Sequence, residues 1–166
     1  MECRILTTLK CNLSCKYCIN KEMQHTFCKI DASDISKLSM YSAYKISGGE
    51  PTMNMSQLDR VVGVLNKFCK PIYLYTNGYF LWKYKEAIAT LFDGVNLGVH
   101  KENAEYWSNN VSMLKECSAS KIHLNKSVVL KKFADKIIER AELYKIPIKY
   151  WKIGECNTYE HRFLIK

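Results

Sequence analysis

Short runs of β-branched and aromatic residues alternate with longer segments of helical periodicity along most of this 166-residue chain. Within the helical segments apolar residues recur at spacings of three and four, as Leu58, Val61 and Val62 do. We predict strands over residues 3–9, 43–47, 72–75, 94–99, 121–129 and 146–153, and helices over residues 55–69, 82–92, 103–116 and 131–144. This alternation predicts an α/β fold with parallel strands and right-handed crossovers.

Six strand–helix units are too few for a closed eight-fold barrel and suit either an open doubly wound sheet or a partial barrel. In both architectures ligands bind at the carboxyl ends of the strands. Unusual residues fall at those ends, namely Gly48-Gly49-Glu50, Thr76-Asn77, His100 and Gly154-Glu155. This coincidence predicts a functional site built from several strand ends.

Composition narrows the class of protein. Hydrophobic residues make up 48% of the chain and charged residues 25%, which permits a buried core. No run approaches the ~18 apolar residues of a membrane helix, and the N-terminal residues lack the plan of a signal peptide. We therefore expect a cytoplasmic protein without a membrane segment.

The net charge of +9 raises the question of a nucleic-acid partner. The basic residues are mostly lysine, and the arginines are Arg4, Arg60, Arg140 and Arg162. Arginine is the side chain preferred for bidentate phosphate recognition and stacking. A solvated, lysine-rich surface is therefore favoured over a nucleic-acid or other acidic partner.

Cysteines give the sharpest chemical signal. Five of the eight are scattered, as expected for small buried residues, whereas Cys11, Cys15 and Cys18 form a Cys-x-x-x-Cys-x-x-Cys loop after the first strand. Soft thiolates select an iron–sulfur cluster or zinc. A structural zinc requires a fourth ligand, for which His25 and Cys28 are the candidates. A zinc-stabilised nucleic-acid-binding module is thus the non-enzyme alternative.

Three motifs together extend this signal. The cysteine loop carries an aromatic residue, Tyr17, just before its third cysteine. The segment Ser47-Gly48-Gly49-Glu50-Pro51-Thr52 follows the second strand, and Thr76-Asn77-Gly78 follows the third. In this order and at successive strand ends, the motifs resemble those of the radical S-adenosylmethionine (radical SAM) superfamily. The resemblance implies a partial (β/α)6 barrel with parallel strands, as a single core domain over residues 1–166.

The resemblance also implies roles for individual residues. Cys11, Cys15 and Cys18 would bind a single 4Fe–4S cluster, and the amine and carboxylate of S-adenosylmethionine would chelate the fourth iron. Tyr17 would lie beside the adenine. Gly48 and Gly49 would let the main chain approach the cofactor. Glu50, followed by Pro51, and nearby carbonyls would accept hydrogen bonds from the cofactor's amino group.

Other positions have open alternatives. Thr76 and Asn77 would contact the methionyl or ribose part of the cofactor, or form an ordinary Asn-Gly turn. Many members of the family have serine where this chain has Gly98, and Asn125 or Ser127 on the fifth strand would substitute for it. Ile153 and Gly154 would pack near the adenine, although a buried strand also explains an isoleucine. His100 would face the substrate, or be an exposed or capped histidine.

The implied activity is reductive cleavage of S-adenosylmethionine at the cluster, giving a 5′-deoxyadenosyl radical that abstracts a hydrogen atom from the substrate. The implied substrate is a peptide, a protein or a small nucleotide-like molecule. Activation of a glycyl-radical enzyme, in which a large protein covers the open side of the barrel, is the alternative within the family. A flavodoxin- or ferredoxin-like protein would supply the electron.

Overall fold

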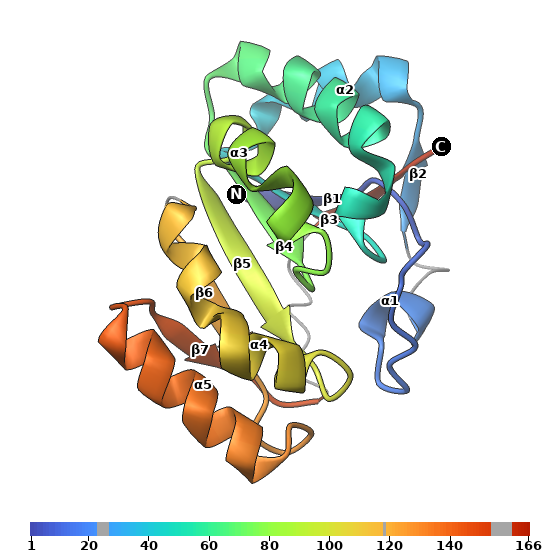
Figure 1. Cartoon of the computed structure of the whole chain (residues 1–166). Coiled ribbons are helices and arrows are strands. Elements are labelled where there is room, and N and C mark those ends of the chain that lie inside the picture. Colours follow the sequence, from blue (N-terminus) through green and yellow to red (C-terminus); the bar gives the residue numbers. More distant parts are fainter. Residues whose placement is uncertain (23–26, 118, 154–160) are drawn as a thin grey trace.

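The computed structural model describes residues 1–22, 27–117, 119–153 and 161–166 (Figure 1). In this part of the chain the strands are β1 (Glu2–Leu6), β2 (Cys28–Ile30), β3 (Ala43–Ser47), β4 (Ile72–Thr76), β5 (Gly94–Val99), β6 (Lys121–Leu124), β7 (Ile148–Tyr150) and β8 (His161–Ile165). They form one sheet in the order β2-β8-β1-β3-β4-β5-β6-β7, and every pairing is parallel.

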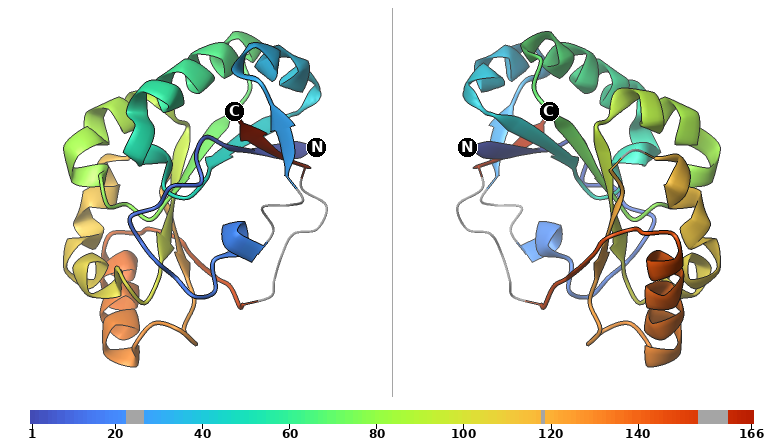
Figure 2. Two further views of the ribbon diagram at one scale, coloured as in Figure 1. Left: turned by 90° about the vertical axis from the view of Figure 1, so that its right-hand side faces the viewer. Right: turned by 90° about the vertical axis from the view of Figure 1, so that its left-hand side faces the viewer.

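The helices are α1 (Ile19–Glu22), α2 (Met55–Leu65), α3 (Leu81–Leu91), α4 (Ala104–Asn110) and α5 (Lys131–Leu143). Short 3-10 segments cover Ala32–Met40, Pro51–Asn54, Asn66–Phe68 and Val111–Glu116. Helices α2 to α5 lie along one face of the curved sheet, and α1 with the preceding loop lies on the other side (Figure 2). We call the first the outer face and the second the inner face.

The sheet order decides between the two predicted architectures. Strands β1, β3, β4, β5, β6 and β7 are neighbours in their chain order, and their crossover helices share the outer face (Figure 2). A doubly wound sheet would reverse its strand order and carry helices on both faces. The prediction of an α/β fold with a parallel partial barrel is confirmed.

Successive side chains along each strand point alternately into the core and toward the inner face. Ile5, Ile46, Leu74, Leu97 and Leu124 are fully buried in the core cluster, which the outer helices complete. From α2, Leu58, Val61, Val62 and Leu65 point into that cluster, as their helical spacing predicts. The intervening strand residues belong to the inner face and are mostly polar.

The number of strands differs from the prediction. Strands β2 and β8 extend the sheet beyond β1, with β8 between β1 and β2. Sequence reasoning missed β2 because only three residues pair and two of them are exposed. It missed β8 because the segment carries charge at its start, with His161 and Arg162 before its apolar residues.

Several predicted boundaries were also too long. The first strand ends at Leu6, because the backbone then turns into the cysteine loop. The predicted strand 121–129 ends at Leu124, because the Asn125 carbonyl accepts hydrogen bonds from Val128 N and Val129 N and closes a turn. Asn125 and Ser127 therefore lie in a loop. The predicted strand 146–153 pairs only over β7, which leaves Ile153 beyond it. The predicted helices 55–69 and 103–116 each end in 3-10 turns.

Among the described residues, none of the helices combines the length and the apolar character that crossing a bilayer requires. Of the scattered cysteines, Cys3 and Cys117 are buried as predicted. Cys28 and Cys69 are exposed instead. Cys156 lies outside the described residues.

Candidate functional site

The cysteine loop joins β1 to α1 on the inner side of the sheet (Figure 2). Cys11 is exposed, Cys18 is half-buried and Cys15 is buried. Burial raises the pKa of the Cys11 thiol. Burial and the neighbouring Glu102 carboxylate together raise the pKa of the Cys15 thiol to about 12. Glu102 Oε2 accepts a hydrogen bond from Cys15 Sγ at 3.3 Å. Negative charge on Cys18 adds to both shifts, and negative charge on Cys11 adds to that of Cys15.

The chemistry of this donor set fits an iron–sulfur cluster. Thiols with raised pKa values, as Cys11 and Cys15 have, are converted to thiolates when a metal centre supplies positive charge. In the part of the chain that the structure describes, no three His, Cys, Asp or Glu side chains converge closely enough to hold a metal ion. The thiols are thus neighbours without an assembled metal site.

The zinc alternative needs a fourth ligand near the same loop. His25 lies outside the described residues. Cys28 lies on β2. Burial raises the pKa of the Tyr41 phenol, and the negative charges of Cys28 and of the core residue Cys3 raise it further. Cys28 is therefore associated with the outer face, whereas the cysteine loop lies on the inner side.

Residues 48–50, which we call the glycine loop, are joined by main-chain hydrogen bonds to the segment that leads from β1 into the cysteine loop. Gly49 N donates to Thr8 O at 2.7 Å, and Glu50 N donates to Lys10 O at 2.8 Å. A Cβ atom on Gly48 would lie 2.3 Å from Thr8 O, and one on Gly49 would lie 2.0 Å from Lys10 O. Both glycines are required because two backbones meet without room for a side chain.

Replacing Gly49 with alanine tests this close approach. We expect Gly49→Ala to push the glycine loop away from residue 10, lower the melting temperature by several degrees and reduce cluster retention. Gly63→Ala in α2 is the matched control, because nothing lies within 4 Å of its Cβ position and alanine favours a helix. Equal melting temperatures for the two variants would contradict the requirement.

Glu50 connects the glycine loop to Thr76 and Asn77 at the end of β4. Its side chain is completely buried, and burial raises its carboxyl pKa while four hydrogen bonds oppose that shift. Thr76 Oγ1 donates to Oε1 at 2.7 Å, and Asn77 N donates to Oε2 at 2.7 Å. Thr52 supplies the other two donors. The carboxylate is thus engaged within the protein, and Pro51 is buried beside it at the start of the 3-10 turn.

The Thr76-Asn77-Gly78 turn in turn contacts the cysteine loop. Asn77 Nδ2 donates to Asn12 Oδ1 at 2.8 Å and lies 3.7 Å from Cys11 Sγ. Gly78 has a φ of +78°, and a Cβ there would lie 2.2 Å from the Trp107 ring. The turn is therefore more than a generic chain reversal, because it positions the first cysteine.

Tyr17 of the cysteine loop forms an aromatic cluster with His100 and Trp151. The Tyr17 ring stacks 6.0 Å from His100, and Trp151 lies 6.2 Å from Tyr17 and 6.3 Å from His100 between ring centroids. Burial raises the pKa of Tyr17 to about 12, and its hydroxyl accepts a hydrogen bond from Lys101 N at 3.2 Å. Sequence reasoning missed Trp151, although its place just after β7 was a usable signal.

His100 explains the glycine that departs from the family pattern. A Cβ on Gly98 would lie 2.9 Å from His100 Nε2, so the imidazole occupies the space beside Gly98. Burial lowers the pKa of His100, and its Nδ1 has no hydrogen-bond partner among the described residues. His100 is therefore a largely buried, neutral histidine rather than an exposed or capped one.

The remaining candidates differ in placement. Asn125 is buried, its Oδ1 accepts hydrogen bonds from Ser127 N and Oγ, and its Nδ2 lacks a partner in the described part of the chain. Ile153 is 54% exposed and outside the sheet. Gly154 and Glu155 lie outside the described residues.

No family model matches the chain. It is 31% identical over 112 residues to a probable GTP 3′,8-cyclase of Methanococcus maripaludis, and 30% identical over 112 residues to one of Methanothermobacter thermautotrophicus. The matched stretch covers 63% of this chain in both cases, but 38% and 37% of those relatives, so the chain matches less than half of their length.

Solved structures extend the likeness to the whole fold. SuiB of Streptococcus suis bound to S-adenosylmethionine has a TM-score of 0.64 at 12% identity, covering 99% of this chain and 47% of that one. Another SuiB structure gives a TM-score of 0.68 at 16% identity, covering 96% and 41%. The sequence relatives, this shared fold and the motifs at its strand ends all point to the same superfamily.

In sequence and in fold the chain is similar to radical SAM proteins. Proteins of that superfamily are enzymes that use S-adenosylmethionine with an iron–sulfur cluster. In this chain, three of the motifs that carry the sequence resemblance meet at one end of the sheet, joined through Glu50 and Asn77.

Proposed function

We propose that this chain is a radical SAM enzyme that binds a 4Fe–4S cluster through Cys11, Cys15 and Cys18. When bound, the reduced cluster supplies the electron that cleaves S-adenosylmethionine to methionine and a 5′-deoxyadenosyl radical, which removes a hydrogen atom from the substrate. The observation that carries this proposal is the network joining the cysteine loop, the Gly48–Glu50 loop and the Thr76–Asn77 turn. These segments follow three neighbouring strands.

The residues of this network divide into ligands and supports. The cysteines supply thiolates, and main-chain atoms of Gly48 and Gly49 border the same loop. Glu50, Thr76 and Asn77 hold these parts in position, because their side chains are engaged with one another and with the cysteine loop. This assignment gives Glu50 a positioning role in place of the expected cofactor contact.

Two buried polar atoms are available for the cofactor. Asn125 Nδ2 and His100 Nδ1 have no partner among the described residues, although buried polar groups are almost always hydrogen-bonded. We assign Asn125, with Ser127, to the ribose or carboxylate of S-adenosylmethionine. Tyr17 and Trp151 provide flat apolar surface for the adenine, which also excludes water from the reacting centre.

Anaerobic reconstitution with iron and sulfide, followed by reduction in the presence of S-adenosylmethionine, tests the proposed function. We expect 5′-deoxyadenosine and methionine to form only when reductant is present. A well-formed cluster that yields no 5′-deoxyadenosine would exclude the radical reaction. Tightly bound zinc without a brown chromophore would instead support the zinc-stabilised binding module.

The substrate is the least constrained part of the function. One similar structure shows SuiB bound to its precursor peptide SuiA, and the sequence relatives are named as GTP cyclases. We propose a substrate from one of these classes, a peptide or a small nucleotide-like molecule, with a flavodoxin- or ferredoxin-like electron donor.

A further inference from the structure

Asn77, which follows β4, contacts the first cysteine of the cysteine loop through its side chain. The residue is only 6% exposed, and its Nδ2 lies 2.8 Å from Asn12 Oδ1 and 3.7 Å from Cys11 Sγ. An amide NH2 group carries two hydrogens, so it can donate one to each of these acceptors. A neutral hydrogen-bond donor therefore lies against the sulfur of a proposed cluster ligand.

The orientation of this amide is fixed by its oxygen. Asn77 Oδ1 accepts a hydrogen bond from Tyr79 N at 2.9 Å. Because a main-chain N–H can only donate, the amide oxygen must face Tyr79, and the amide nitrogen must then face Cys11. The group beside the sulfur is therefore a donor, since the opposite orientation would set the NH2 group against the N–H of Tyr79.

The main chain of Asn77 is held by three other side chains. Its N donates to Glu50 Oε2 at 2.7 Å. Its O accepts hydrogen bonds from Asn103 Nδ2 and from Trp107 Nε1, both at 2.9 Å. Every polar atom of the residue thus has a partner, so the amide has little freedom to turn away from Cys11.

Asn103 extends this support to the next strand. Its Nδ2 also donates to Gly98 O at 3.0 Å, and its Oδ1 accepts a hydrogen bond from His100 N at 2.7 Å. The side chain of Asn103 therefore joins the turn after β4 to the end of β5. Three neighbouring strand ends together position Asn77, which is more support than an Asn-Gly turn needs.

Among the described residues, Cys11 Sγ accepts a hydrogen bond from one side chain, that of Asn77, and from the main-chain N of Leu13 at 3.4 Å. Hydrogen bonds to the sulfurs of an iron–sulfur cluster change the potential at which the cluster takes up an electron. The added electron increases the negative charge on the sulfurs, and a donor interacts more strongly with a charged acceptor. A donor beside Cys11 Sγ therefore stabilises the reduced form and raises the potential.

We propose that Asn77 is a positioning residue that raises the reduction potential of the cluster by donating its side-chain N–H to Cys11 Sγ. The step that it favours is the transfer of one electron from the flavodoxin- or ferredoxin-like donor, which is oxidised, to the cluster, which is reduced. No bond is broken and no proton is transferred in that step. The assignment of the sulfur to a cluster rests on the proposed function, whereas the contact between Asn77 and Cys11 does not.

The reduction potential of the anaerobically reconstituted chain tests this role, measured by a redox titration that follows the EPR signal of the reduced cluster. S-adenosylmethionine is left out, so its cleavage does not enter the measurement. Asn77→Ala removes the amide and keeps the main-chain N and O with their partners. We expect the same iron content as in the unmodified chain and an equilibrium constant for reduction that is about tenfold lower, a decrease of ~59 mV for one electron.

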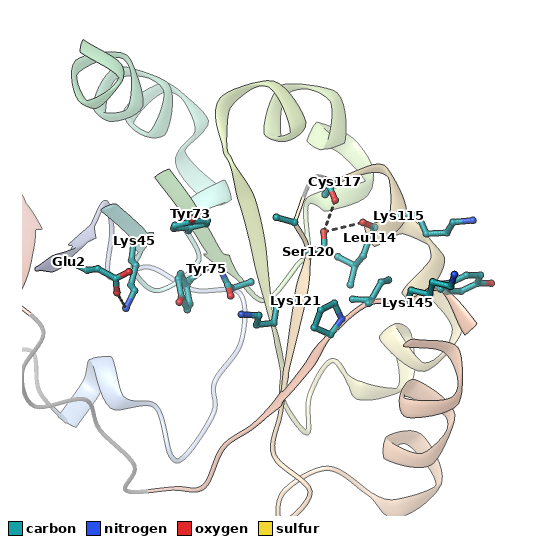
Figure 3. A pocket seen from close by; sticks show the side chains of 15 residues that line it. Glu2, Lys45, Tyr73, Tyr75, Leu114, Lys115, Cys117, Ser120, Lys121 and Lys145 are labelled. Atoms are coloured by element: carbon teal, nitrogen blue, oxygen red, sulfur yellow. Dashed lines mark hydrogen bonds and ion pairs between the residues drawn. The ribbon is translucent and has the colours of Figure 1, made fainter. Parts of the chain in front are cut away.

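Ser120→Ala is the matched control, because it also removes buried hydrogen bonds. Ser120 is 9% exposed, and its Oγ donates to Leu114 O at 3.0 Å and to Cys117 O at 2.9 Å. These three residues border a pocket of about 710 Å³ (Figure 3). Ser120 precedes β6, at the amino end of that strand, whereas the cysteine loop lies at the carboxyl ends. The equilibrium constant of this control should stay within about twofold of that of the unmodified chain.

Asn77→Asp separates the donor from the shape of the side chain, and it supplies the measurement if Asn77→Ala does not fold. Its carboxylate keeps an acceptor for Tyr79 N and replaces the NH2 group beside Cys11 with a second oxygen. Because this change also adds negative charge, the equilibrium constant for reduction should fall further than in Asn77→Ala.

The outcomes separate this inference from the proposed function. An unchanged or higher potential in the Asn77 variants, an equal decrease in Ser120→Ala, or loss of iron from Asn77→Ala would overturn the role of Asn77. A cluster whose potential falls as expected, but which yields no 5′-deoxyadenosine in the unmodified chain, would support this role and overturn the proposed function. Absence of a cluster from the unmodified chain would overturn both.

Discussion

A chain carrying Cys15→Ser should lose its iron–sulfur chromophore while remaining folded. Cys15 is the most buried of the three loop thiols, and two remaining thiolates are too few to hold a cubane. Bound iron should fall from about four atoms per chain to less than one, as measured by iron analysis and by absorbance after anaerobic reconstitution. Formation of 5′-deoxyadenosine should fall to the level without enzyme.

Cys117→Ser provides the matched control for this loss. Cys117 is 5% exposed and Cys15 is 7% exposed, so the two substitutions place a hydroxyl in similarly buried positions. The control should keep full iron content whatever its effect on the melting temperature. Full iron content in Cys15→Ser, or loss of iron in Cys117→Ser, would show that the cluster ligands are assigned wrongly.

Removing the Glu50 carboxylate should have the largest effect on stability. Glu50→Ala leaves buried donors of Thr52, Thr76 and Asn77 without their acceptor, and each unsatisfied donor costs about 1–3 kcal/mol. We expect a loss of about 3 kcal/mol or more in the free energy of unfolding, measured by urea denaturation. The melting temperature should fall by roughly 6–12 °C.

Glu50→Gln separates shape from charge in the same position. The amide keeps the volume but turns an NH2 group toward hydrogen-bond donors, so its stability should lie between those of Glu50→Ala and the unmodified chain. It also provides a measurement if Glu50→Ala does not fold. The exposed Glu139→Ala on α5 is the control and should stay within about 0.5 kcal/mol. A Glu50→Ala chain as stable as this control would contradict the network.

The sequence located the three motifs at their strand ends, but it did not predict the contacts that join them. The cysteine loop, the glycine loop and the Thr76–Asn77 turn were located because such residues at consecutive strand ends must meet at one edge of a parallel sheet. The engagement of Glu50 was not predictable, because a motif does not show which donors surround a carboxylate. His100 beside Gly98 was missed for the same reason, since the contact depends on the path of the loop after β5.

The inner face shows a second limit of sequence reasoning. Lys121 and Lys149 looked like members of a lysine-rich surface, because composition does not distinguish a convex surface from a concave one. The register sets Lys149 beside His123 on the inner face, and burial together with nearby lysine charges lowers the pKa of His123 to about 4. Strand β8 was missed because its pairing with β1 joins segments at opposite ends of the sequence.

The position of β8 has a consequence for how the chain folds. Cys3 pairs with Tyr44 across roughly 40 residues of chain, but with His161 across roughly 160. Closing the longer loop costs about 1 kcal/mol more in chain entropy, so the β1–β8 pairing should form late. Until then β1 presents an unpaired edge, which can pair with another nascent chain. Folding yield should therefore fall steeply with protein concentration during refolding.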